Sequence, residues 1–253
     1  FVDKGKDFGS DSVKMIPSVN VAILSGEPTS TLSFGEIWHF FEQQLGYPVT
    51  VLDTEYFSNI DLSKYHVLIL PEFWGSLDDS QTKKVKDWVR NGGKLIAIGD
   101  ALGSLTGDDG FGLTRKEIKK DSVNTNVNTE AYAGVARDYI KNMITGAIFK
   151  AKVDVTNPLA FGYGDTYFTL KLSGDAFELL ESGNAVYLED NAKPFSGFAG
   201  SEAQKKQGNS IIFGTKREGR GQVVFMVDNP LFRGFWENGK LFFVNAVFAV
   251  GNR

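Results

Sequence analysis

Four carboxylates, at Glu27, Glu72, Asp100 and Asp228, come shortly after apolar runs that resemble buried strands, and Asn229 follows the last of them. The carboxyl ends of parallel strands share one edge of a sheet, where ligands of such sheets bind. Carboxylates grouped there would bind a cation, or would act as an acid–base pair with one raised pKa. The alternative, which we favour, is that each carboxylate caps a helix N-terminus, where the helix dipole stabilises negative charge.

A second group surrounds Asp100, in the segment Gly99-Asp100-Ala101-Leu102-Gly103. Two glycines at this spacing, after a strand, are typical of a sharp turn that presents a nucleophilic Ser or Cys. The central residue here is Ala101, whose methyl group cannot attack a substrate. The chain has no cysteine, which excludes a thiolate nucleophile, a thiolate metal site and disulfides.

His39 and Glu42 have the spacing of two zinc ligands in carboxypeptidases. A zinc site needs at least one further protein ligand. The only other histidine is His66, which precedes a predicted strand and would lie at the opposite edge of the sheet. We therefore predict no metal site and interpret His39 as an ordinary residue of a helix.

Aromatic residues concentrate in two places, at Phe73 and Trp74 and again at Phe235 and Trp236. They would form either a platform for a sugar or peptide, or an apolar surface packed against a partner domain, which we favour. We expect the segment 230–236 to pack on the region 150–215 or to form an interface, with Arg233 paired to a carboxylate.

The order of the predicted elements indicates an α/β protein. Strands alternate with helices in the first hundred residues, and such alternation produces a parallel sheet covered by helices on both faces. We predict a flavodoxin-like three-layer α/β/α architecture with a mainly parallel central sheet, built as a single domain over 1–253. Residues 1–17 are a loose lead-in, and the insertion-rich region 104–215 adds hairpins on one side of the sheet. The predicted strands cover 19–24, 48–52, 67–70, 94–99, 166–172, 185–188, 209–213 and 223–227, and the predicted helices cover 33–45, 80–90, 130–145 and 240–250.

The composition excludes several classes of partner. Lysine and arginine total 27 against 31 acidic residues, a net charge of −4, so no basic field would attract nucleic acid. The longest apolar stretch, 241–250, is too short for the roughly 20 residues of a membrane span. The chain starts at Phe1, and we expect a processed protein or a fragment of a longer one.

The strand and turn over 92–103 resemble the class I glutamine amidotransferase-like fold, whose active members carry a cysteine at the position of Ala101. The segments 228–236 and 241–246 resemble the C-terminal amidotransferase-like domain of certain secreted bacterial zinc carboxypeptidases. The resemblance covers about 19–248 and is weakest over 104–150. Active amidotransferases pair the cysteine with a histidine, followed two residues later by a glutamate. The matching place here reads Asp228-Asn229-Pro230, so neither partner of the triad is present.

The resemblance implies a catalytically inactive accessory domain, active in assembly or in ligand or substrate binding. Its expected partner is a covalently linked peptidase domain, with a homo-oligomer as an alternative. No cofactor is expected in this domain, since the zinc would lie in a catalytic domain outside the chain. The implied location is periplasmic or extracellular. Two alternatives remain open: a hydrolase that uses Glu27, Glu72 or Asp228, and a sugar- or peptide-binding module.

Overall fold

Five apolar runs of the chain form the parallel half of one sheet. The computed structural model describes residues 18–107, 110–117 and 139–251, with positions 5, 7, 9, 10, 13 and 137. The parallel strands lie in the order β2, β1, β3, β4, β11. They are β1 (Val21–Ser25), β2 (Val49–Asp53), β3 (Val67–Leu70), β4 (Lys94–Ile98) and β11 (Gly221–Met226), so each predicted parallel strand is confirmed to within two residues.

The two helices that connect neighbouring parallel strands begin at capping residues. The side chain of Ser30 accepts a hydrogen bond from the backbone of Ser33 at the start of α1. Asp78 and Gln81 form a reciprocal capping box at the start of α2, which satisfies two backbone N–H groups. The helices are α1 (Thr31–His39), which continues as a π-helix over Phe40–Leu45, α2 (Asp79–Arg90), α4 (Ser201–Gln207) and α5 (Glu237–Phe248). Short 3-10 helices cover Thr54–Asn59, Leu62–Lys64, Gly99–Leu105, Pro158–Ala160 and Phe232–Gly234.

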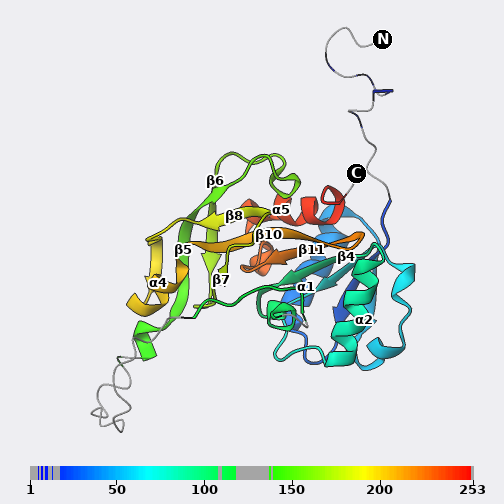
Figure 1. Ribbon diagram of the computed structural model, residues 1–253, viewed down its shortest axis with the longest axis horizontal. Helices are drawn as coiled ribbons and strands as arrows, with labels where there is room; N and C mark the ends of the chain where they lie inside the picture. Colours follow the sequence, from blue (N-terminus) through cyan, green and yellow to red (C-terminus); the bar gives the residue numbers. More distant parts are fainter. Residues whose placement is uncertain are drawn as a thin grey trace.

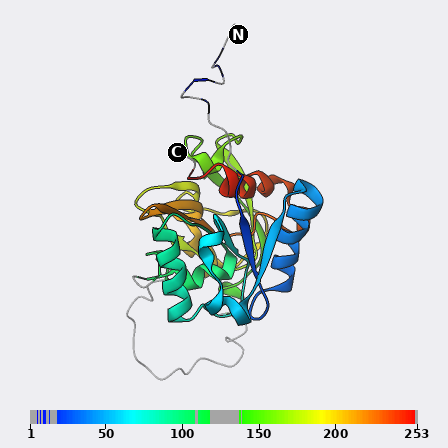
Figure 2. The same cartoon turned by 90° about the vertical axis from the view of Figure 1, so that its right-hand side faces the viewer.

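The parallel strands bury both faces, which gives the molecule three layers. Alternate side chains of a strand point to opposite faces, so Ile23 and Leu24 of β1 belong to two different cores. The core of Ile23 lies under α1 and α5, where the rings of Phe41 and Phe243 meet edge to face with centroids 5.8 Å apart. The core of Leu24 lies under α2 and includes Val85. Figure 2 shows α1 and α2 on opposite sides of the parallel strands.

The β-rich region extends the same sheet with antiparallel strands. β10 (Ser210–Glu218) pairs antiparallel with β11, and the order continues through β8 (Asn184–Leu188), β5 (Ile144–Val153) and β6 (Thr166–Lys171). Two short strands join at the side, β7 (Phe177–Glu178) on β10 and β9 (Pro194–Ala199) on β5. Together the strands form one eleven-stranded sheet (Figure 1).

One expectation about this region is confirmed and one needs correction. Consecutive strands form antiparallel pairs, β10 with β11 and β5 with β6, and these pairs extend the sheet on one side of the parallel strands. The helix expected over 130–145 ends earlier than predicted, since residues 139–141 are helical but Ile144 already begins the long strand β5. The stretch 121–129 and most of that expected helix lie outside the described residues.

The molecule has a flavodoxin-like α/β fold, in which parallel pairing is confined to the five strands from β2 to β11. No helix in the part of the chain that the structure describes is long and apolar enough to cross a bilayer.

Candidate functional site

The loops after β3, β4 and β11 meet around a cavity of about 160 Å³ at the carboxyl edge of the sheet. Four of the six candidate pocket residues line this cavity, namely Glu72, Asp100, Asp228 and Asn229. The opposite wall comes from the end of β6 and the loop that leads to β7, including Ser173 and Asp175. Parallel strands that end at one edge of the sheet account for the first wall, as the sequence predicts. The second wall depends on how the antiparallel half folds over that edge.

Glu27 and Ala101 do not line this cavity, which corrects the sequence prediction for both residues. Glu27 lines a separate cavity beyond β1 and β2. Ala101 lies in the 3-10 helix that follows β4 and is fully buried in the core under α2. The tight helical turn begins immediately after the strand and directs the Ala101 methyl group into the protein rather than into the cavity.

Gly99 and Asp100 are the residues of the turn that line the cavity. The φ of Gly99, +56°, lies in the left-handed region, where glycine is favoured. A Cβ atom on Gly99 would lie 2.6 Å from Cγ and 2.7 Å from Oε1 of Glu72. The Glu72 side chain therefore fills the space into which a side chain at position 99 would project.

Glu72 is the most perturbed acid of the site. Burial is the main cause that raises the pKa of its carboxyl from 4.5 to about 7, and the negative charges of Glu36 and Asp100 raise it further. A hydrogen bond from Asn229 partly opposes this rise. Burial also raises the pKa of Glu36, against hydrogen bonds from the backbone of Arg233 and from Asn229. Burial, and then the nearby carboxylate of Asp175, raise the pKa of Asp100.

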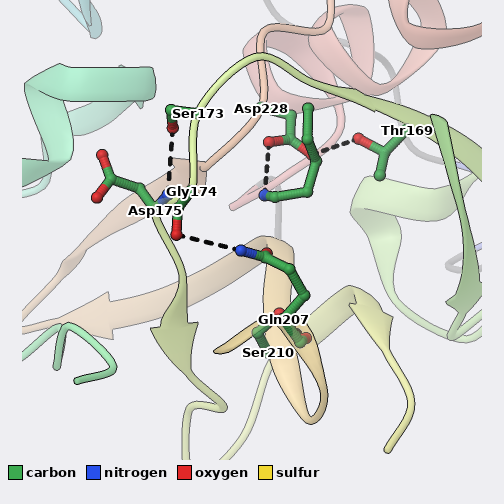
Figure 3. A network of polar contacts seen from close by, with 8 residues as sticks. Thr169, Ser173, Gly174, Asp175, Gln207, Ser210 and Asp228 are labelled. Carbon is green, nitrogen blue, oxygen red and sulfur yellow. Dashed lines mark hydrogen bonds and ion pairs between the residues drawn. The ribbon is translucent and has the colours of Figure 1, made fainter. Parts of the chain in front are cut away.

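Asp228 is held by a buried ion pair. Lys171 Nζ lies 2.9 Å from Asp228 Oδ1, and the Lys171 and Asp228 side chains are 1% and 7% exposed. The Thr169 hydroxyl donates a hydrogen bond of 2.5 Å to the other carboxylate oxygen, as Figure 3 shows. Both oxygens of Asp228 are thus engaged by side chains of β6, so this carboxylate is occupied structurally.

The loop between β6 and β7 is held by further polar contacts, within itself and to α4 and Arg115. Gln207 Nε2 donates to the carbonyl oxygen of Gly174 at 3.1 Å, and the Ser173 hydroxyl accepts from the backbone N–H of Asp175 at 3.3 Å (Figure 3). Arg115 forms an ion pair with Asp175. These contacts fix the second wall of the cavity.

Sequence reasoning missed Glu36, Thr169, Lys171 and Asp175. The alternation of β6 contains a partial signal, since Thr169 and Lys171 share its buried face with Tyr167. A lysine on a fully buried face is rarely found without a partner, and the strongest partner is an acid. The identity of that partner, 57 positions away in the chain, has no signal in the sequence.

The histidines do not form a metal centre with the acids. His39 is the exposed last residue of α1, and no group of three or more potential ligands is found among the residues that the structure describes. His66 Nδ1 instead accepts a hydrogen bond from the backbone N–H of Asn20 at 2.9 Å.

The aromatic candidates divide into buried and exposed residues. Phe73 is 2% exposed and packs in the core under α2, which corrects its assignment to an interface. Trp74 and Phe235 are 75% and 60% exposed. Trp236 is half-buried, and its Nε1–H donates to the Tyr167 hydroxyl at 3.2 Å, so the segment does pack on the β-rich region through β6.

Arg233 contacts a carboxylate, that of Glu36, but through its backbone and not as the expected ion pair. The contact is made by the backbone N–H of Arg233, which donates to Glu36 Oε1 at 2.9 Å. The guanidinium carbon lies 5.2 Å from the centroid of the Phe232 ring. Asn229 Nδ2 donates to the other oxygen of Glu36 at 2.8 Å, so Glu36 joins α1 to the turn after β11.

No family model matches the chain, and no curated protein matches it. Several solved structures match its fold. A protein from Parabacteroides merdae described as ThuA-like has a TM-score of 0.54 at 14% identity, over 93% of this chain and 91% of that chain. A second protein described as ThuA-like, from Bacteroides uniformis, has a TM-score of 0.53 at 11% identity, over 94% of each chain. A glutamine amidotransferase from Thermotoga maritima has a TM-score of 0.51 at 10% identity, over 84% of this chain and 76% of that chain.

These similarities define the class of fold. The chain has a glutamine amidotransferase-like α/β fold, which it shares with the ThuA-like proteins as well as with the amidotransferase itself. At identities of this size the likeness shows the fold alone, and function has to be argued from the site.

Proposed function

We propose that this chain is a non-catalytic amidotransferase-like domain that serves as the accessory domain of a secreted bacterial zinc carboxypeptidase. In this proposal it acts in assembly or in substrate binding, it is covalently linked to the peptidase domain, and it works in the periplasm or outside the cell. The zinc belongs to the peptidase domain and not to this one.

The observation that carries the non-catalytic part is the burial of Ala101, the position at which active amidotransferases carry their cysteine. Its methyl group is fully buried in the core under α2 and cannot attack a substrate. The chain contains no cysteine to act from another position. Acyl transfer from glutamine through a thiolate therefore has no nucleophile here.

Release of ammonia from glutamine tests this part of the proposal. The native chain and the variant Glu72→Gln are incubated with glutamine, with Glu42→Gln as the matched control because Glu42 is an exposed residue of the π-helix. We expect no ammonia above the blank from any of the three. Turnover by the native chain that Glu72→Gln abolishes and Glu42→Gln preserves would overturn the proposal.

The peptidase association rests on the residues 228–236 and 241–246, which resemble the accessory domain of such enzymes. The full-length protein, purified from its native source, is assayed for zinc-dependent carboxypeptidase activity with and without this domain. We expect activity in the full-length protein and altered activity or yield when the domain is deleted. A native protein without a peptidase domain would contradict the association.

A second candidate function is supported by the unequal acids of the cavity. Glu72, whose pKa is raised to about 7, is about half protonated at neutral pH, whereas Asp228 is paired with Lys171. Acids with such different environments serve as general acid and carboxylate in glycoside hydrolysis. The engagement of both Asp228 oxygens weighs against this candidate. Hydrolysis of nitrophenyl glycosides that Glu72→Gln abolishes would establish it.

A further inference from the structure

A second cavity, of about 370 Å³, lies beyond the carboxyl ends of β1, β2 and β3. The loops after these three strands and the first turn of α2 surround it. Its volume falls within the range of about 300–1,000 Å³ that is usual for small-molecule sites. It shares no lining residue with the cavity around Glu72, so it is a separate feature of the same sheet edge.

The position of this second cavity in the fold is one at which ligands bind. β1 pairs with β2 on one side and with β3 on the other, so the order of the sheet reverses at β1. Chain connections leave β1 and β3 toward opposite faces, which opens a crevice outside their carboxyl ends. Open α/β sheets bind ligands at such switch points.

The lining of the cavity selects the chemistry of a ligand. Leu24, Phe57 and Phe73 provide an apolar floor and are each at most 2% exposed. The lining also includes three acids, Glu27, Asp53 and Glu55, and contains no lysine, arginine or histidine. An anionic ligand would be repelled, while an apolar group attached to a cation would match both the floor and the acids.

The acids have no cation of their own in the structure. None of the three forms an ion pair with any residue in the described part of the chain. Asp53 accepts the backbone N–H of Glu55 at 2.8 Å, which orders the rim at the start of the 3-10 helix. Like charges that remain unpaired at a cavity favour a positively charged ligand.

Thr29 adds a polar group to the wall of the cavity. This residue lines the cavity and is 7% exposed, and its hydroxyl oxygen is buried without a hydrogen-bond partner among the described residues. Buried polar side chains in folded proteins nearly always have a partner, and a water or a ligand group would supply the one that this hydroxyl lacks.

We propose that this switch-point cavity binds a small organic cation, an amine or guanidine that carries an apolar ring. The ring lies on the floor formed by Leu24, Phe57 and Phe73, and the cationic group lies at the rim near Glu27 and Glu55. This site would function whether or not the domain belongs to a peptidase.

The test compares three probes of similar shape and different charge: phenethylamine, phenethyl alcohol and phenylacetate. Binding is measured near neutral pH by titration calorimetry and by saturation-transfer NMR. We expect phenethylamine to bind about fivefold more tightly than the alcohol, and phenylacetate not to bind. Raising the ionic strength from about 0.01 to about 1 M shortens the screening length from about 30 to about 3 Å and should remove the preference for the amine.

The double variant Glu27→Gln/Glu55→Gln tests whether the preference for the amine over the alcohol arises at this cavity. Both residues are exposed, so the variant is expected to fold, which its melting curve checks. The matched control is Glu42→Gln/Glu189→Gln, which makes the same change of charge at exposed positions outside the cavity. We expect the first variant to bind amine and alcohol equally and the control to keep the native preference. No binding of phenethylamine at millimolar concentration, equal binding of phenylacetate, or an unchanged preference in the first variant would each overturn the proposal.

Discussion

Replacement of Glu72 by glutamine should change how the stability of the protein depends on pH. In the folded state burial raises the pKa of Glu72 from 4.5 to about 7. Between these two values the folded protein holds a proton that the unfolded chain releases, so the stability of the native protein falls as pH rises. A difference of about 2.5 pKa units at about 1.36 kcal/mol each amounts to about 3 kcal/mol. The stabilising contribution of Glu72 protonation is thus fully present below pH 4.5 and is lost as the pH rises through about 7.

Glutamine at this position stays neutral at every pH. The free energy of unfolding of the variant should therefore not fall between pH 4.5 and about 7 as that of the native protein does. Above the folded pKa it should be more stable than the native protein by up to about 3 kcal/mol, and near pH 4.5 the two should differ little. Glu36 and Asp100 would also lose a repulsive neighbour at high pH. Urea denaturation at several pH values between about 4.5 and 8.5 measures the difference, with Glu42→Gln as the surface control. Curves for the native protein and Glu72→Gln that stay parallel over this range would refute the reasoning.

Three further substitutions test the packing of the site and of the sheet. Lys171→Met removes the cation from the buried carboxylate of Asp228, and we expect urea denaturation to show a loss of about 3–5 kcal/mol at neutral pH that shrinks in acid. A loss of the same size at neutral and at acidic pH would contradict the role of the Lys171 charge. Trp236→Phe keeps a ring but removes the N–H donated to the Tyr167 hydroxyl, and it should cost about 1 kcal/mol and about 2–4 °C in melting temperature. An unchanged melting temperature would show that this contact does not form in solution. Gly221→Ala places a Cβ 2.0 Å from a backbone oxygen of α2 and should cost about 1–3 kcal/mol in thermal unfolding, whereas native stability would show that β11 and α2 are not so close.

The parallel half of the fold could be predicted from local patterns. Runs such as Val67–Leu70 are apolar throughout because both faces of a parallel strand are covered by helices. The long strand β5 was missed, since residues 144–153 mix lysines and a glycine with apolar residues and follow a segment with helical composition. Its place in the sheet depends on pairing with β6, β8 and β9, which are distant in sequence.

The candidate site could likewise be predicted only in part from the sequence. The rule that parallel strands end at one edge predicted that Glu72, Asp100, Asp228 and Asn229 would lie together, and they line one cavity. The same rule failed for Glu27, because the cavity beside β1 is separate from the one beside β4. It also failed for Ala101, because a motif spacing does not fix the direction in which a turn projects each side chain.

The sequence by itself determined the order of strands and helices in the parallel half, the acidic character of the sheet edge and the absence of a cysteine nucleophile. These properties depend on residue types and on periodicity along the chain, which need no knowledge of distant contacts. Only the tertiary structure decided that Lys171 neutralises Asp228, that Glu72 occupies the space beside Gly99, and that the pKa of Glu72 is raised to about 7. Each of these depends on burial and on the distance between groups far apart in the chain. Electrostatic energies vary steeply with both quantities, so they are set when the layers pack.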